Sequence, residues 1–282
     1  MAKKVKICAD STCDLSPELL SQYDIDVFAL PVNLGEKACL DGIDVQPDDL
    51  YQYYRTTGKL STTSAPSMPE YLEFFKKYVE QGVAVIHFSI SSEMTITHNN
   101  CRMAAETLPD VYAIDTQSLS SGMGRLAIEA AKMAQEGMDA ESIVERINQK
   151  KNLVEVSFIL DTLEFLWKGG RCSGLSAMGA NLLKLKPCIE VKDGKMVVGK
   201  KYRGQLGNVH GEYIENCLKG RTDLDLSLIF ITHSGIEQQY IDRAVAKVKQ
   251  VQPFQEVIVT KAGCSVSSHC GPGTLGIIYM RK

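Results

Sequence analysis

Three absences narrow the functions open to this 282-residue sequence. No block of like charges interrupts a chain whose net charge is −3, and non-specific nucleic-acid binding depends on neutralising phosphates, so no nucleic-acid partner is expected. No apolar run approaches the roughly 18 residues that a membrane span needs. The first ten residues turn acidic too soon for a signal peptide. These features predict a cytoplasmic protein.

Motifs for common cofactors are also missing. No Walker sequence is present, so a nucleotide is not expected. The nine cysteines include no Cys-x-x-Cys pair, which favours reduced thiols that act as small apolar side chains. A zinc site at Cys264, His269 and Cys270 is an alternative, but their spacing matches no standard ligand pattern. We therefore expect neither a metal nor a cofactor.

What the first half does contain is a repeated order of strand, polar turn and helix. Apolar strands are expected at residues 5–9, 83–90 and 111–114, and Asp10-Ser11, Ser91-Ser92 and Asp115-Thr116 follow them; residues 27–34 are a further apolar run. Helices are expected to begin at Ser16 and at Asp48, and to span Ser67 to Gln81, residues 122–136 and residues 139–152. A further helix should begin after the Ser91-Ser92 turn and end near residue 107. This order predicts a three-layer α/β/α domain with a parallel sheet over residues 1–154, binding its ligand at the carboxyl ends of the strands.

The second half has a different pattern. An Asp193-Gly194 pair between two apolar segments predicts a β-hairpin. Further strands are expected at 154–160, 226–232, 256–259 and 275–280, helices at 205–218 and 236–250, and a loop at 263–274. This pattern predicts a second α/β domain with a mixed sheet over residues 155–282.

One hydroxyl-rich stretch stands out. Residues 61–64 read Ser-Thr-Thr-Ser, and Ala65-Pro66 then leads into a helix whose Ser67 and Glu70 have capping-box spacing. The residue before proline favours extended backbone, so the hydroxyl run should be a loop entering that helix. Hydroxyls and free N–H groups at a helix entrance suit an anionic oxygen. The alternative is a polar loop with an ordinary cap.

Several motifs, taken together and in order, resemble those of the DegV family of fatty-acid-binding proteins. They are Thr63-Ser64-Ala65-Pro66-Ser67, the Ser91-Ser92 turn, Leu163-Glu164-Phe165-Leu166-Trp167-Lys168-Gly169-Gly170-Arg171, Leu182-Leu183-Lys184-Leu185-Lys186-Pro187, Asp193-Gly194, Tyr202-Arg203-Gly204 and His269-Cys270-Gly271-Pro272-Gly273. The resemblance runs from about residue 5 to residue 280.

The resemblance implies a two-domain α/β protein with one long-chain fatty acid in an enclosed tunnel near the domain junction. The residues that it implies for binding the carboxylate are Thr63, Thr95 and His269. Two departures bear on this site: Thr95 stands where the family usually has Ser, and Ile96 replaces the usual Gly, which removes backbone conformations with φ > 0.

The resemblance further implies a carrier rather than an enzyme. Some members present the bound carboxylate to a separate fatty acid kinase subunit, similar to dihydroxyacetone kinase, which makes the acyl phosphate used in phospholipid metabolism. Arg171 and Arg203 are then expected to dock that partner; the alternative is that both are ordinary surface charges. Contact with a membrane surface would be transient at most.

An enzymatic alternative stays open at this point. A lipid hydrolase or acyltransferase could use Ser64, Ser92 or Thr95 as nucleophile and His269 as base. Against it, no Gly-x-Ser-x-Gly sequence is present and no acidic residue is placed to orient His269.

The remaining histidines and Trp167 have simpler expectations. His87 and His233 belong to apolar strands and should be core residues, whereas His98 and His210 should be exposed on helices. Trp167 is expected to pack in the interior.

Overall fold

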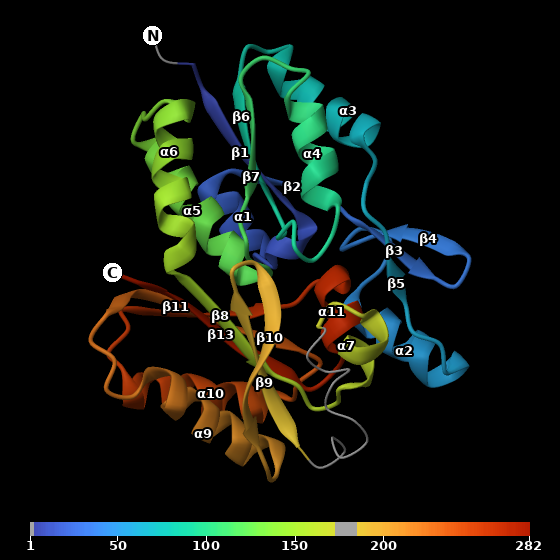
Figure 1. The fold of residues 1–282 in the computed structure, drawn as a ribbon, viewed down its shortest axis with the longest axis vertical. Helices are drawn as coiled ribbons and strands as arrows, with labels where there is room; N and C mark the ends of the chain where they lie inside the picture. The colour runs from blue at the N-terminus through green and yellow to red at the C-terminus, as the bar shows by residue number, and fades with distance from the viewer. Residues whose placement is uncertain (1–2, 173–184) are drawn as a thin grey trace.

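Two stacked sheets and one helix between them position the candidate site (Figure 1). The computed structural model describes residues 3–172 and 185–282. The 182–184 part of the Leu-Leu-Lys motif lies outside the described residues.

The first sheet is parallel throughout. In spatial order it consists of β2 (Ile25–Phe28), β1 (Val5–Asp10), β6 (Ala84–Ser89) and β7 (Val111–Asp115). One face is covered by α3 (Met68–Val79) and α4 (Thr97–Ala105), and the other by α1 (Pro17–Tyr23), α5 (Ser121–Gln135) and α6 (Ala140–Lys150). All six residues of β6 are buried, as expected of a parallel strand covered on both faces. The predicted three-layer arrangement is confirmed.

The apolar run at 27–34 is divided between two strands, because the chain leaves the first sheet after Phe28. The amide N–H of Leu30 donates to Ser11 Oγ at 3.1 Å instead of to a neighbouring strand. A separate antiparallel sheet then forms, with the spatial order β4 (Lys37–Leu40), β3 (Pro31–Leu34) and β5 (Thr62–Thr63). In the chain, helix α2 (Pro47–Thr57) lies between β4 and β5. The hydroxyl run is therefore partly a strand rather than a loop.

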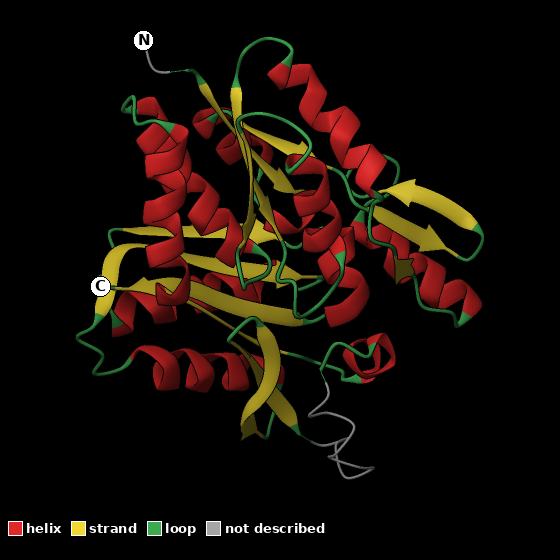
Figure 2. Cartoon of the chain, turned by 45° about the horizontal axis from the view of Figure 1, so that its top comes forward, coloured by secondary structure: helices red, strands yellow, loops and turns green. Residues whose placement is uncertain are grey.

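The second sheet is mixed, as predicted. Its order is β10 (Lys195–Tyr202), β9 (Lys186–Lys192), β8 (Val154–Ile159), β13 (Thr274–Arg281), β11 (Leu224–Ser234) and β12 (Glu256–Lys261). Only its β11–β12 pair is parallel among the pairings of the described strands. Helices α9 (Leu206–Leu218) and α10 (Gln238–Val251) cover the face away from the first sheet, and Figure 2 shows these strands between helices above and below.

The β9–β10 hairpin turns at Asp193 and Gly194, as predicted. Both residues have positive φ, at 50° and 76°, which is what a two-residue hairpin turn with the right twist requires. The boundary of the two domains near residue 155 stays a prediction. Of the helices between residues 3 and 172 or 185 and 282, none has the length and apolar character needed to cross a bilayer.

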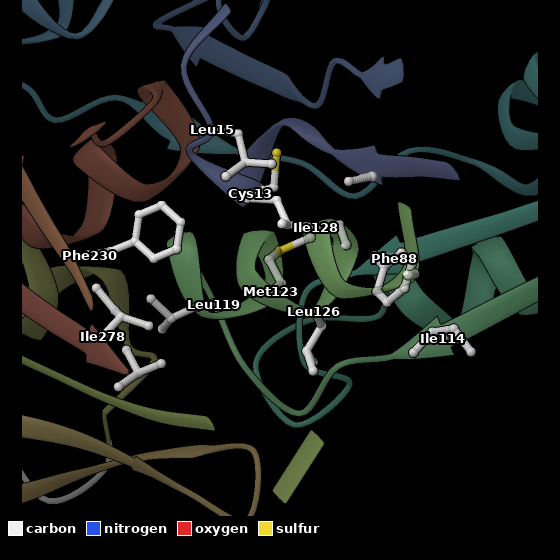
Figure 3. Close-up of a cluster of buried hydrophobic side chains, with 14 of the residues drawn as sticks. Cys13, Leu15, Phe88, Ile114, Leu119, Met123, Leu126, Ile128, Phe230 and Ile278 are labelled. Atoms are coloured by element: carbon white, nitrogen blue, oxygen red, sulfur yellow. The ribbon is translucent and has the colours of Figure 1, made fainter. Parts of the chain in front are cut away.

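Helix α5 lies between the two sheets and joins their cores. Figure 3 shows Met123, Leu126 and Ile128 of this helix among side chains of the first sheet, while Leu119, just before it, lies toward Phe230 and Ile278 of the second sheet. Glycines let the helix approach closely. A Cβ on Gly124 would come within 2.7 Å of the carbonyl oxygen of Cys13 and of the Leu15 side chain.

This close approach gives a prediction with an internal control. Gly124→Ala should lower the free energy of unfolding by about 1–3 kcal/mol, because the added methyl overpacks against backbone. Gly211→Ala, in the middle of α9 with nothing within 4 Å of the new Cβ, should instead raise stability by about 0.5–1 kcal/mol. Urea unfolding of both variants measures the two changes. A stabilised Gly124→Ala protein would contradict the close packing of α5.

Candidate ligand-binding site

A short helix from the second half contacts the hydroxyl-rich stretch of the first half, which contains strand β5. This helix, α11 (Cys264–Cys270), occupies residues for which a loop was predicted, so that prediction is wrong. Its Ser268 Oγ lies 2.8 Å from Ser61 Oγ, and its His269 Nε2 lies 3.0 Å from Thr63 Oγ1. The structure thus brings together Thr63 and His269, which are 206 residues apart in the sequence.

Two buried aspartate side chains from the first half hold the start of α11. Asp41 accepts from the amides of Cys264 at 2.7 Å and Ser265 at 3.0 Å. Asp14 accepts from the amide of Gly263 at 2.8 Å. The free N–H groups at a helix start need such acceptors, and a negative charge is favourable there. Because this cap comes from more than 200 residues away, local sequence gives no sign of the helix.

His269 is held as a neutral imidazole. Burial, together with the nearby charge of Arg171, lowers the pKa of His269 to about 4. Its Nδ1 is buried and has no hydrogen-bond partner among the described residues. A Cβ on Gly169, at the end of α7 (Glu164–Gly169), would lie 2.5 Å from that nitrogen, so only glycine leaves room for the ring.

Thr95 belongs to the turn after β6. Its Oγ1 lies 2.9 Å from Thr97 Oγ1 and accepts from the Thr97 amide at 3.3 Å. The tip of the β9–β10 hairpin braces this turn, since Ser91 Oγ donates to the carbonyl of Gly194 at 2.7 Å. Thr95 makes no direct hydrogen bond to Thr63 or His269 in the described part of the chain.

Thr63, Thr95, His269 and Arg171 all line one cavity between the two halves. The centre of a water molecule can reach about 120 Å³ of it, roughly ten times the space that one water needs. Its walls are mostly apolar and include Leu119, Val156, Phe158, Leu166, Met196 and Ile278. Ser64 and Arg171 are exposed and lie at the mouth, whereas Val156 and Ile278 are buried and lie deeper.

The two predicted docking arginines lie in different places. Arg171 is exposed, lines the cavity mouth and donates to the Gly169 carbonyl at 2.5 Å. Arg203 is exposed in the turn after β10 and does not line the cavity. The position of Arg171 at the cavity mouth had no signal in the sequence beyond the two glycines that precede it.

The residues proposed for zinc do not form a metal site. The thiol of Cys264 donates to the carbonyl of Val45, and that of Cys270 to the carbonyl of Val266, both at 3.1 Å. In residues 3–172 and 185–282 no group of His, Cys, Asp or Glu side chains is arranged to hold a metal.

Three of the simpler expectations are wrong. His210 is 2% exposed and thus buried, and His98 is half-buried with its Nδ1 3.3 Å from Ser89 Oγ. Trp167 is 58% exposed rather than packed in the interior. His87 is buried as expected, with Nε2 2.9 Å from Asp10. His210 and His98 are less exposed than expected because each lies on a helix face that packs against a neighbouring element.

The geometry gives no support to an enzyme built on His269. Thr63, which the alternative did not name as nucleophile, is the hydroxyl residue at its Nε2. Ser64 Oγ instead accepts from Asn33 Nδ2 at 2.8 Å, and Ser92 Oγ donates to Asp115 at 2.5 Å. With its pKa lowered to about 4 and no carboxylate on Nδ1 in the described chain, His269 is a weak base.

One glycine spacing looks like a dinucleotide motif but is not placed like one. Gly271-Pro272-Gly273-Thr274-Leu275-Gly276 has the Gly-x-Gly-x-x-Gly pattern. It runs from helix α11 into strand β13, whereas the fingerprint leads from a strand into a helix whose N-terminus binds the pyrophosphate.

Comparison with known proteins agrees with the motifs. The model of the family described as "Uncharacterised protein, DegV family" matches residues 4–282. This chain belongs to the DegV family. A DegV domain-containing protein of Clostridium perfringens is 29% identical over 99% of both chains.

Solved DegV structures share the whole fold. A DegV family protein of Thermus thermophilus, whose structure is described as showing fatty acid binding, is 27% identical with a TM-score of 0.89, over 99% of this chain and 100% of that one. A Thermotoga maritima protein described as a DegV lipid-binding protein is 25% identical with a TM-score of 0.85, over 99% and 100% of the two chains.

The anchor residues of this DegV site were not foreseen from the sequence. Asp14 and Asp41 hold α11, and Ser120 Oγ donates to Asp14. The only sequence signal was indirect: Asp14 follows the carboxyl end of β1, where parallel sheets collect polar side chains.

Asp14 gives a pH prediction. Burial raises its pKa from 3.8 to about 8, with the charge of Asp41 adding to the effect. Between these values the unfolded chain has lost the proton that the folded protein keeps, so stability contributed by Asp14 falls as pH rises. Asp14→Asn, which retains an acceptor for Gly263, should remove this slope. Urea unfolding at pH 5, 7 and 9 should therefore show the variant gaining on wild type with rising pH; a constant difference would contradict a protonated Asp14.

Proposed function

We propose that this protein binds a long-chain fatty acid in the cavity between its two halves, with the carboxylate at Thr63, Thr95 and His269. The observation that carries the proposal is the cavity itself, whose walls are mostly apolar and which Thr63, Thr95, His269 and Arg171 line together. The fatty acid binding described for the Thermus thermophilus relative supports it.

The energetics favour such a ligand. Each buried CH₂ group contributes about 0.8 kcal/mol before the costs of binding, so a long chain supplies most of the affinity. A carboxylate accepts about four hydrogen bonds, and each bond to a charged group adds roughly 1.5–3 kcal/mol. The Thr63 and Thr95 hydroxyls and the His269 ring supply such donors once the ligand displaces their present partners.

Arg171 adds a positive charge at the mouth. Its effect on the pKa of His269 indicates that the guanidinium and the ring are close enough to interact. A fatty acid carboxylate between them would be attracted by Arg171 and would favour a proton on His269. We therefore assign Arg171 to the carboxylate as well as to the edge of a partner-docking surface.

The protein acts as a carrier in this proposal. The carboxylate lies at the exposed end of the cavity, where Ser64 and Arg171 reach solvent, so a cytoplasmic fatty acid kinase subunit could phosphorylate it in place. The protein supplies enclosure and orientation, and the kinase supplies ATP chemistry. Arg203 belongs to the docking surface, outside the cavity.

The head-group assignment is tested at Thr63. Thr63→Val keeps the shape but removes the hydroxyl, and should weaken binding of palmitic acid by about tenfold, the size of one hydrogen bond to a charged group. Thr63→Ser keeps the hydroxyl and should bind within about threefold of wild type. Displacement of a fluorescent fatty acid measures both. Equal affinities for all three proteins would show that the carboxylate does not lie at Thr63.

The two arginines separate binding from presentation. Arg171→Gln should weaken palmitic acid binding by about tenfold or more, because a charged partner of the carboxylate is lost. Arg203→Glu should leave binding unchanged but slow acyl-phosphate formation when the kinase subunit and ATP are added. If Arg203→Glu supports phosphorylation at the wild-type rate, Arg203 is not part of the docking surface.

A further inference from the structure

Several buried hydroxyl residues line the cavity away from its mouth, and three of them have hydrogen-bonding capacity left over. Thr12, Ser120 and Ser265 are 3%, 4% and 5% exposed, and all three lie on the cavity wall. We call them the inner hydroxyl set. They come from the turn after β1, the N-cap of α5 and the first turn of α11. A tunnel for a plain hydrocarbon chain has no use for polar groups there.

The hydrogen bonds of this set are incomplete. Ser265 Oγ is buried and has no partner among the described residues. Thr12 Oγ1 donates to Met123 Sδ at 3.4 Å, and this thioether sulfur, its one hydrogen-bond partner within residues 3–172 and 185–282, is a weak acceptor. Ser120 Oγ donates to Asp14, which leaves its own lone pairs free to accept. Buried polar atoms are normally paired, so an unpaired hydroxyl on a cavity wall points to a missing partner.

The backbone that carries the set is fixed. The amide of Ser265 donates to Asp41, and Ser11, the neighbour of Thr12, donates to the same carboxylate oxygen at 3.0 Å. Ser120 has φ 55°, an unfavourable conformation for a residue with a side chain. These constraints keep the three residues at the wall.

From this geometry, and resting on the proposed function, we infer that the preferred ligand is a hydroxy fatty acid whose chain hydroxyl binds the inner hydroxyl set. A hydroxyl is both donor and acceptor, so it can accept from Ser265 and donate to the free lone pairs of Thr12 or Ser120. Ser265 precedes His269 by four residues on α11, about 6 Å along the helix. The chain hydroxyl should therefore lie in the half of the acyl chain nearer the carboxylate.

The inference is tested with stearic acid and monohydroxystearic acids that carry the hydroxyl near the carboxylate, at mid-chain or at the methyl end. Affinities come from displacement of a fluorescent fatty acid. Wild type should bind one carboxyl-proximal isomer roughly three- to tenfold tighter than stearic acid, the effect of one net hydrogen bond. The isomer with the hydroxyl at the methyl end should bind more weakly than stearic acid.

Ser265→Ala should abolish this preference and leave stearic acid bound as tightly as before or tighter. The matched control is Ser268→Ala on the same helix, which removes a hydroxyl that is bonded to Ser61 and does not line the cavity; the preference ratio should persist there. Thr12→Val, which keeps the side-chain shape, provides a second variant should Ser265→Ala not fold, and should reduce the ratio.

The outcomes are distinguishable. If wild type binds stearic acid but shows no preference for any hydroxy isomer, or if the preference survives both Ser265→Ala and Thr12→Val, the inference is wrong while the proposed function stands. If neither stearic acid nor any hydroxy isomer binds, the proposed function fails with it.

Discussion

The hold of Asp14 and Asp41 on the start of α11 is the contact on which the candidate site depends. A seven-residue helix has little stability by itself. Three consecutive backbone amides at its start, those of residues 263–265, donate to side-chain oxygens of Asp14 and Asp41 from the first half of the chain. This clamp sets the direction of the helix, and with it the positions of His269 at the mouth and Ser265 farther in.

The packing of α5 makes that contact possible. The helix fills the space between the two sheets, and glycines on its surface allow the Cys13 backbone on one side and the Val156 side chain on the other to come close. Its N-terminal segment also brings Ser120 to the cavity wall, where the hydroxyl meets Asp14. One helix thus fixes both the separation of the sheets and part of the lining of the cavity.

Local patterns in the sequence were sufficient for much of the fold. The apolar run at 83–90 contains the buried parallel strand Ala84–Ser89, because such a run suits a strand covered on both faces. Asp193-Gly194 forms a hairpin because both residues accept positive φ. The failures involve distant partners. Leu30 leaves its strand because its amide bonds to Ser11, and α11 forms because Asp41 caps it.

The candidate site, like the fold, could be predicted from the sequence only in part. Motif resemblance named Thr63 and His269, and the structure places them 3.0 Å apart. The motif resemblance did not name Asp14, Asp41 or Ser265, whose importance comes from burial and from contacts across more than 200 residues. A property such as an unpaired hydroxyl exists only in three dimensions.

The pairing of Ser61 with Ser268 and of Thr63 with His269 has a consequence for how such proteins diverge. One side of the mouth comes from the first half of the chain and the other side from the second half. A substitution in one segment therefore changes its contacts with the other segment. A chimera that joins the first half of one relative to the second half of another would inherit two complete sheets but a mismatched entrance between them.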